Sequence, residues 1–344
     1  MTLSDLRYRA RRVGLVTVLV ALVLTLLYLM TGLAHHLKTE PGRAVDRIGA
    51  STWILADGVD GPFTAASVLP ISARDELSAT FDGVVEPFVV SRGALLPSPD
   101  AEKVEVQLVG HGIGKLGQPQ LTDGVAVSGP GEIVLDSSLD VSIGTEVEIG
   151  VERFTVVGLT SDSTVLAGQA FGFIDLTDAQ RIAFQSDQVV TGFLTDRPAS
   201  FVAGYSFSSA DAVADETLGP IESAVASIDL IRILLWFVAA IVMGAVIYLT
   251  ALERERDFAV LKAVGASGRS LGAGLALQAV IVALLASLIG AIAAKLIEPV
   301  FPLPVTIPTS ALFTVPLVAV CVGLVSAMLG VRKVNRTDPA EAFS

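Results

Sequence analysis

Four apolar runs, each close to the length that crosses a lipid bilayer, constrain the fold of this chain more than any other feature. They cover residues 13–33, 231–252, 271–294 and 312–331. A transmembrane helix needs about 20 predominantly apolar residues. The composition agrees, because only 17% of the 344 residues are charged, against about 25% in a typical soluble domain. A large part of the chain is therefore expected to lie in lipid.

The first run could be mistaken for a secretory signal peptide, since several arginines precede it. Its apolar stretch is longer than the apolar core of a signal peptide, which has about 7–15 residues. No small-residue cleavage site follows it cleanly. The run is therefore predicted to be a retained membrane span.

The basic residues predict the orientation of the spans. They gather before the first run, between the second and third, and after the fourth: Arg7, Arg9, Arg11, Arg12, Arg254, Arg256, Lys262, Arg269, Arg332, Lys333 and Arg336. Such residues accumulate on the cytoplasmic side of a membrane. Both termini and the loop after the second run are thus expected to be cytoplasmic, and the long segment 34–228 outside.

The segment 34–228 carries the acidic character of the protein. It has 10 Lys or Arg against 27 Asp or Glu, a formal charge of −17, while the rest of the chain has 13 against 8, or +5. This charge argues against nucleic acid as a partner. The single cysteine, Cys321, lies in the fourth run, where it is expected to be a small packing residue. A domain without cysteine has no disulfides, so its own apolar core must stabilise it.

Short strands broken by glycine and proline are predicted within this segment, at 103–110, 132–136, 146–150 and 153–159. Helices are predicted at 72–79, at 176–184 and from 210 towards 228, with Ser72 and Thr177-Asp178 as N-caps. The fold class expected is a membrane α-helical protein with four transmembrane helices. An extracytoplasmic α+β domain is inserted between the first and second of them.

The expected organisation follows the chain in nine parts. They are a cytoplasmic N-terminus (1–12), transmembrane helix 1 (13–33), the extracytoplasmic α+β domain (34–228), transmembrane helix 2 (229–252), a cytoplasmic coupling helix (253–269), transmembrane helix 3 (270–295), a short extracytoplasmic loop (296–311), transmembrane helix 4 (312–331) and a cytoplasmic tail (332–344).

Small residues recur four apart in the last three spans. They are Ala240 and Gly244, then Ala286, Gly290 and Ala294, then Gly323 and Ala327. Small residues let helix backbones approach closely in lipid, so these positions predict helix–helix contacts. Pro316 is expected to kink the fourth span.

Two nucleotide-binding motifs are matched only superficially. The stretch GIGKLG at 112–117 fits the G-x-G-x-x-G pattern, but Pro119 follows where a phosphate-binding helix should begin. A Walker A motif fails because Val109 and Leu116 stand at required positions. These glycines are predicted to form turns. The only histidines are His35, His36 and His111, and no catalytic constellation or intrinsic metal site is apparent.

The segment 253–264 is compatible with a short amphipathic helix that ends at Gly265. An apolar stripe contains Phe258, Leu261 and Val264, and charged residues flank it. One interpretation is an interfacial helix that rests on anionic lipid headgroups. The other is a helix that docks into a groove of a cytoplasmic partner.

The stretch ERERDFAVLKAVGAS and the closing RKVNRTDPAEAF resemble the permease subunits of the FtsX/MacB superfamily of ABC transporters. The segment GEIVLDSSLDVSIGTEVEIGVERFTVVGL at 131–159 is also similar to that family, although Gly144-Thr145-Glu146 lacks the aspartate of the family's G-D-T-like turn. The order of one span, a large exported domain and three further spans matches as well. The resemblance covers nearly the whole chain.

The resemblance implies a homodimeric permease in a bacterial cytoplasmic membrane that works with two separate ABC ATPase subunits. ATP and Mg²⁺ would be used by those subunits, so this chain would be no enzyme and would hold no cofactor. Its coupling segment would transmit nucleotide-driven movement to the spans and the exported domain. The residues expected to couple to the ATPase are Glu253, Arg254, Arg256, Asp257, Phe258, Ala259, Leu261, Lys262, Gly265 and Ala266.

Heme is the leading substrate expectation, because the compact form resembles the heme exporters of the HrtB type within the superfamily. Heme export needs an iron ligand near the outer half of the bilayer. The candidate substrate-binding residues are Glu222, His35, His36, Met30, Tyr28 and Trp236, with Glu222 as a heme-iron ligand. Export of a peptide, antibiotic or lipid, and activation of an extracellular partner such as a cell-wall hydrolase, remain alternatives.

Overall fold

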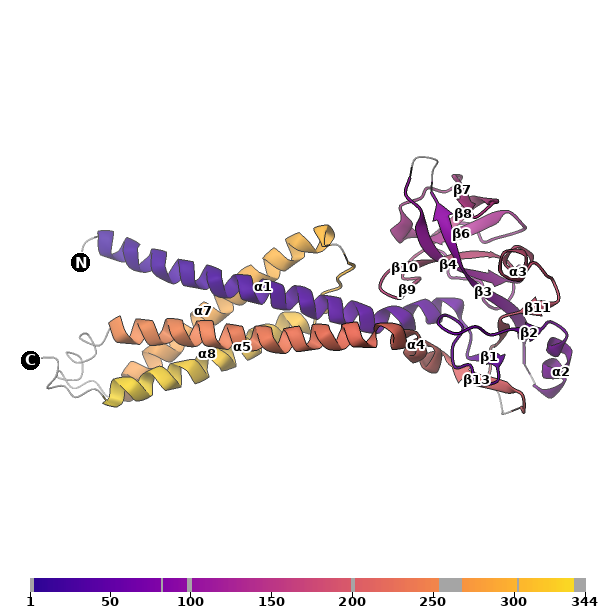
Figure 1. Ribbon diagram of the computed structural model, residues 1–344. Helices are drawn as coiled ribbons and strands as arrows, with labels where there is room; N and C mark the ends of the chain where they lie inside the picture. Colours follow the sequence, from indigo (N-terminus) through magenta and orange to yellow (C-terminus); the bar gives the residue numbers. More distant parts are fainter. Residues whose placement is uncertain are drawn as a thin grey trace, which may run out of the picture. The chain divides into compact units, whose positions relative to one another are not determined.

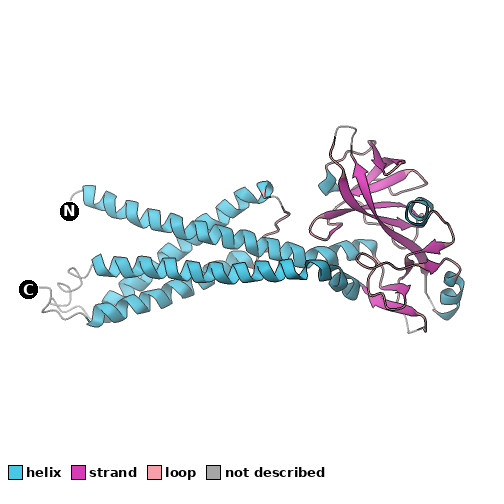
Figure 2. Ribbon diagram, in the orientation of Figure 1, coloured by secondary structure: helices cyan, strands magenta, loops and turns pink. Residues whose placement is uncertain are grey.

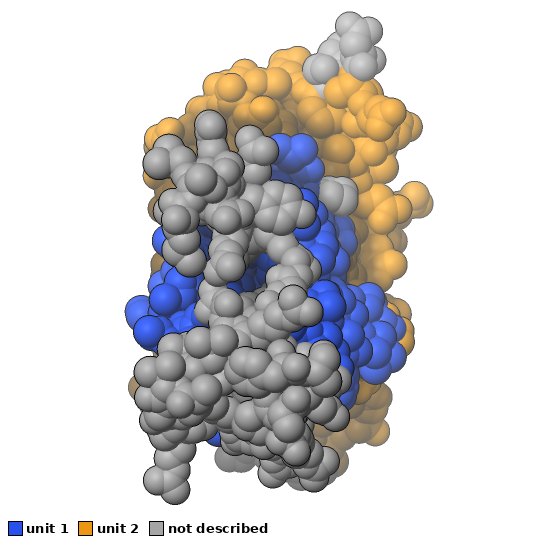
Figure 3. Space-filling view, turned by 90° about the vertical axis from the view of Figure 1, so that its left-hand side faces the viewer, with its two compact units in different colours: residues 1–36, 224–344 blue, residues 37–223 orange. Residues whose placement is uncertain are grey.

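The computed structural model describes residues 3–81, 83–97, 101–198, 202–253, 268–301 and 303–336. The chain divides into two compact units, which Figure 3 shows in different colours. The first unit contains residues 1–36 and 224–344, and the second contains residues 37–223. Each unit is described by itself.

The first unit is helical (Figures 1 and 2). Its elements are α1 (Leu3–Ile48, of which residues up to 36 belong here), α5 (Glu222–Glu253), α7 (Gly268–Ile297), the short 3₁₀ helix η3 (Glu298–Val300) and α8 (Ala311–Arg336). Within the part of the chain that the structure describes, four helical stretches are long and apolar enough to cross a membrane: Gly14–Ile48, Ala210–Ala245, Ala276–Val300 and Ala311–Met328. The four transmembrane helices expected from the sequence are thereby confirmed.

Two of these helices run past the ends expected from the apolar runs. α1 continues to Ile48 although Pro41 lies inside it. A proline has no amide hydrogen to complete the helical bond to the carbonyl four residues earlier, yet the helix persists because Ala44, Val45 and Ile48 are buried in the core of the second unit. α5 begins at Glu222, before the apolar run.

The second unit is an α+β domain and contains the strands of the described chain (Figure 2). Its strands are β1 (Thr52–Ala56), β2 (Leu69–Pro70), β3 (Val85–Leu96), β4 (Val104–His111), β5 (Asp123–Gly124), β6 (Glu132–Asp136), β7 (Glu146–Ile149), β8 (Glu152–Thr160), β9 (Thr164–Val165), β10 (Gln169–Asp175), β11 (Val189–Val190), β12 (Gly192–Thr195) and β13 (Tyr205–Ser209). Its helices are α2 (Ala73–Thr80), η1 (Ser137–Leu139), α3 (Leu176–Phe184), α4 (Ala210–Leu218) and η2 (Gly219–Ile221).

In the described residues eleven strands form one sheet, and β11 and β2 form a separate pair. Nine strands of the sheet follow the order β13-β1-β12-β3-β4-β10-β6-β8-β5, while β9 pairs with β10 and β7 lies beside β3 and β8. The pairs β4–β10 and β6–β8 are parallel, and the others are antiparallel. β7 pairs with both β3 and β8, which closes a ring of six strands through β4, β10 and β6. β10 therefore lies between two neighbours, near the middle of the sheet.

Two apolar cores stabilise the domain. One is lined by residues from every strand of the ring, such as Leu108, Ile133 and Val147, and is covered by α2 and α3. The other contains an aromatic group: Phe88, Phe171 and Phe173 on the opposite face of β3 and β10, together with Trp53 of β1 and Phe63 of the loop that follows it. The end of α1 and Val213 of α4 also belong to this second core.

The local sequence pattern predicts several elements correctly and one helix N-cap wrongly. The predicted strand 132–136 and helix 176–184 are confirmed to the residue. The N-cap assigned to the helix 176–184 was wrong, because Asp175 accepts the amide of Thr177, while Thr177 and Asp178 lie inside the helix. The GIGKLG stretch forms turns after β4, as predicted, with positive φ angles at Gly114 and Gly117.

Candidate functional site

One face of α1 makes the polar contacts that connect it to the rest of the first unit. Tyr28, Gly32 and His36 recur every fourth residue, which places them on the same side of the helix. The Tyr28 hydroxyl lies 2.8 Å from the hydroxyl of Ser287 on α7. His36 Nδ1 lies 3.1 Å from Thr306 Oγ1, in the segment before α8. This face of α1 is therefore internal.

Gly32 lets the segment before α8 lie directly on α1. A Cβ atom at position 32 would lie 2.6 Å from Val305 Cγ1 and 3.2 Å from the Ile307 amide nitrogen. The amide of Thr306 also donates to the Gly32 carbonyl oxygen, at 3.4 Å. Any larger residue at position 32 would push this segment away and separate His36 from Thr306.

Gly290 and Gly323, two of the small residues that recur in the spans, lie where helices cross, as predicted. A Cβ at Gly290 of α7 would lie 3.0 Å from the Ala21 carbonyl oxygen and 3.1 Å from the Thr25 amide nitrogen of α1. A Cβ at Gly323 of α8 would lie 2.9 Å from the sulfur of Met243 on α5. Such close approaches supply the van der Waals contacts that hold helices together in lipid.

The residues expected to bind substrate lie on α1 and α5. Tyr28 and His36 are buried towards α7 and the segment before α8. Met30 and His35 on α1 and Trp236 on α5 are half-buried. Glu222 is exposed and belongs to the second unit. Among the described residues, no group of three or more His, Cys, Asp or Glu side chains is arranged to hold a metal ion.

Ser287 and Thr306 are hydrogen-bond partners of α1 that the sequence did not predict. A hydroxyl residue in an apolar span is a weak signal for an interhelical hydrogen bond, and Ser287 sits inside the third apolar run. That signal does not identify the partner, because Tyr28 lies 259 residues away.

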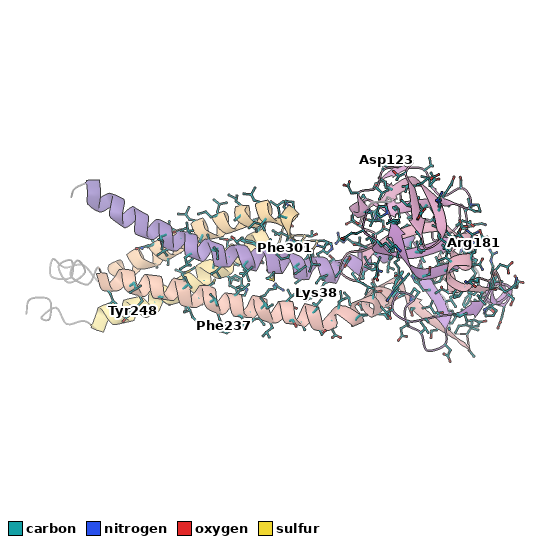
Figure 4. All side chains as sticks on the ribbon, turned by 45° about the horizontal axis from the view of Figure 1, so that its top comes forward. Lys38, Asp123, Arg181, Phe237, Tyr248 and Phe301 are labelled. Atoms are coloured by element: carbon teal, nitrogen blue, oxygen red, sulfur yellow. The ribbon has the colours of Figure 1, made fainter. Side chains whose placement is uncertain are left out.

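The outward-facing side of α5 is largely apolar. Phe237 is 62% exposed and Tyr248 is 40% exposed, and both are labelled on α5 in Figure 4. Leu230, Ile233 and Ile241 are exposed as well. Lipid chains or another apolar surface must cover these side chains in a membrane.

The residues expected to couple to an ATPase begin at the last residue of α5 and continue beyond it. Glu253 ends that helix. The others lie outside the described residues: Arg254, Arg256, Asp257, Phe258, Ala259, Leu261, Lys262, Gly265 and Ala266. Their role stays a prediction.

Comparison with known proteins places the chain in a family. Residues 230–339 match the family described as FtsX-like permease C-terminal. An uncharacterized ABC transporter permease of Mycobacterium tuberculosis is 35% identical over 99% of this chain and 98% of its own length. A second one from the same species is 32% identical over 99% of this chain and 98% of its own length.

More distant likenesses were also found. The HrtB permease of Staphylococcus epidermidis, whose name assigns it to a hemin transport system, is 21% identical over 99% of this chain and 97% of its own length. The periplasmic region of MacB from Actinobacillus actinomycetemcomitans covers 51% of this chain and 96% of its own, with 15% identity and a TM-score of 0.36. The extracellular domain of YknZ from Gram-positive bacteria covers 43% of this chain and 84% of its own, with 13% identity and a TM-score of 0.31.

The assignment rests on the relatives that match from end to end, together with the family match over the last three spans. The four membrane-spanning helices and the inserted α+β domain agree with it. The chain belongs to the ABC transporter permeases, and its residues 230–339 match their FtsX-like C-terminal family.

Proposed function

We propose that this chain is the permease subunit of an ATP-driven exporter and that it works as a homodimer with two separate ATPase subunits. Those subunits would bind ATP and Mg²⁺ and carry out the hydrolysis, while the permease itself catalyses no reaction. The observation that carries this proposal is the 35% identity to an ABC transporter permease over 99% of the chain. The exposed apolar side chains of α5 supply surface that a second copy could cover.

In the proposed arrangement the protein lies in a bacterial cytoplasmic membrane with both termini in the cytoplasm. The second unit is then extracellular. The excess of Lys and Arg at the chain ends and in the 253–269 loop supports this orientation. The same loop contains the residues proposed to contact the ATPase, and it lies within the matched family region.

Heme taken from the membrane is the proposed substrate. The support is the likeness to HrtB over nearly the full length of both chains. Glu222 is the proposed iron ligand, because its carboxylate is exposed at the start of α5 and a homodimer would contain two of them. Carboxylate oxygens are suitable ligands for hard cations such as ferric iron.

A second candidate function is the mechanical activation of an extracellular partner, such as a cell-wall hydrolase. It is favoured by α1, which contributes residues to both units and is part of the domain core. Export of a peptide, an antibiotic or a lipid would use the same ATPase-driven movement of the membrane spans.

Titration of the purified complex with hemin tests the substrate. The wild type should show a saturable Soret shift that Glu222→Ala removes. Glu298→Ala is the matched control, since Glu298 follows α7 and pairs with Lys295 at 2.8 Å. A Soret shift that persists in Glu222→Ala would contradict Glu222 as the iron ligand. His35 and His36 would then be the next candidate ligands to substitute. The absence of a shift in every protein would exclude heme and leave the family assignment unchanged.

A further inference from the structure

The last turns of α1 are part of the core of the second unit. Ala44, Val45 and Ile48 are buried with Trp53 and Phe88 of the sheet. Ile48 follows Ala44 by four positions and Val45 by three, so the three residues lie on one face of the helix, and that face lies on the sheet. This part of α1 is therefore packed into the domain as part of its core.

The loop that joins β8 to β10 has an unusual backbone. The φ angles are 57° at Asp162, 53° at Leu166, 71° at Ala167 and 105° at Gly168. Residues other than glycine rarely adopt such angles. They keep them only where the surrounding structure holds them in place.

Glu40 of α1 holds this loop. Its Oε2 accepts the amide of Ala167 at 3.1 Å, and its Oε1 accepts the amide of Gly168 at 2.7 Å. The side chain is almost completely buried, with 1% exposed. Successive amides in such a turn can point to the same side and form a nest for an anion. Here both oxygens of one carboxylate occupy that nest.

Two arginines one and two turns further along α1 hold the start of the same loop. Arg43 Nη1 lies 2.6 Å from Asp162 Oδ1, and Arg47 Nη2 lies 3.6 Å from Asp162 Oδ2. Arg47 also donates to Ser161 Oγ at 3.3 Å. Glu40, Arg43 and Arg47, which we call the α1 clamp, therefore hold the loop 161–168 at both ends.

The clamped loop is tied directly to the middle of the sheet. β9, inside the loop, pairs with β10, and the amide of Phe171 donates to the Ser163 carbonyl oxygen at 2.8 Å. Asp136 at the end of β6 accepts the amide of Ser163 at 2.8 Å. A path of hydrogen bonds thus connects α1 to β10 and β6, through the side chains of Glu40 and Asp136 and the backbone of the loop.

Pro41 lies between Glu40 and Arg43, and it is the reason why α1 needs contacts on both sides of this position to pass on a movement. The proline removes one hydrogen bond of the helix, so α1 bends more easily here than elsewhere. Without contacts on either side of Pro41, bending would absorb a movement of the helix. Glu40 precedes the proline, and Arg43 and Arg47 follow it.

We infer that the α1 clamp passes movement of α1 to strand β10 of the extracellular domain, with Glu40 as the main positioning residue. This inference rests on the proposed function, in which ATPase-driven movement of the spans reaches that domain. The clamp residues are not proposed to contact substrate.

The test uses the full-length permease with its ATPase subunits in lipid nanodiscs. A spin label at Val151→Cys, in a Cys321→Ala background, reports the distance between the two domains of the homodimer. Val151 is 97% exposed in the turn between β7 and β8. The distance is measured without nucleotide and with ATP bound, and the ATPase rate is measured in parallel.

The variants are Glu40→Gln, which cannot accept both amides, and Asp162→Asn, which weakens the arginine contacts. Asp140→Asn is the matched control, because Asp140 also has a positive φ, 53°, but lies in the turn after η1. We expect the ATP-dependent distance change in the wild type and the control. Glu40→Gln should lose it and Asp162→Asn should reduce it, while ATP hydrolysis continues in both.

Hydrogen exchange separates a loss of the clamp from general unfolding. In Glu40→Gln the amides of Ala167 and Gly168 should exchange faster, while the amides of β10 should exchange as in the wild type. If Glu40→Gln does not fold, Asp162→Asn decides the question, because the Asp162 side chain is 45% exposed and its replacement should be tolerated. A full distance change in the variants would overturn the clamp. A wild type that shows no ATP-dependent change would instead contradict the proposed function.

Discussion

The hydroxyl oxygens of Tyr28 and Ser287 lie 2.8 Å apart and join α1 to α7 across 259 residues of sequence. Both side chains are buried. Because hydrogen bonds between membrane helices contribute about 0.6 kcal/mol on average and up to about 1.7 kcal/mol, Tyr28→Phe should lower the stability by about this amount. The measurement is the free energy of unfolding of the detergent-solubilised permease.

A double-mutant cycle separates this contact from other effects of the substitution. Ser287→Ala should cost a similar amount, and the double variant should cost less than the sum of the two single variants. Strict additivity would show that the two hydroxyl groups do not stabilise each other.

The crossing of α1 and α7 at Gly290 gives a second prediction. An added methyl group would lie 3.0 Å from the Ala21 carbonyl oxygen and 3.2 Å from Leu24 Cβ. Overpacking of this kind costs about 1–3 kcal/mol, so Gly290→Ala should lower the melting temperature. Gly274→Ala on the same helix is the matched control, since among the described residues no atom outside its own stretch of helix lies within 4 Å of the added Cβ. An equal response of the two variants would mean that α1 does not approach α7 this closely in the membrane.

The helices and several strands could be predicted because their signals are local. The four apolar runs have the length of membrane spans, and the strand 132–136 is a short buried run between turn residues. β3, the longest strand, was not predicted. It contains Pro87 and Gly93, which weaken a strand signal, but its pairing with β12, β4 and β7 outweighs that preference.

The contacts of α1 could not be predicted because they depend on residues far away in the sequence. Glu40 lies 127 and 128 residues before the amides that it accepts. In the sequence it is one carboxylate beside a proline, a position that favours a helix end. The burial of Ala44, Val45 and Ile48, together with the contacts of the α1 clamp, stabilises the helix beyond the proline.

The coupling segment gives a prediction that concerns the ATPase directly. Phe258→Asp and Leu261→Asp would place charges on the apolar stripe proposed to enter a groove of the ATPase. Each variant should reduce the amount of ATPase that co-purifies with the permease, and the double variant should abolish it. Ser344→Asp, which adds the same charge outside the stripe, should have no effect. Full co-purification of the double variant would favour the alternative of a helix resting on lipid headgroups.

His111 at the end of β4 predicts a loss of stability in mild acid. Its side chain is fully buried, and its Nδ1 lies 3.0 Å from the Gly112 carbonyl oxygen. Burial lowers the pKa of His111 below its ordinary value of 6.5, although the Gly112 carbonyl and Asp175 act in the opposite direction.

The folded protein therefore keeps the imidazole of His111 neutral at a pH where the unfolded chain binds a proton. Stability from this residue is complete above pH 6.5 and is lost as the pH falls from that value towards the lower pKa of the folded state, by at most about 1.4 kcal/mol per pH unit. Melting curves between about pH 5.5 and 7.5 should thus show a steeper decline for the wild type than for His111→Gln, which cannot titrate. The other two histidines, His35 and His36, are present in both proteins, so the difference between the two pH slopes reports on His111. Parallel slopes would mean that His111 is hydrated or charged in the folded domain.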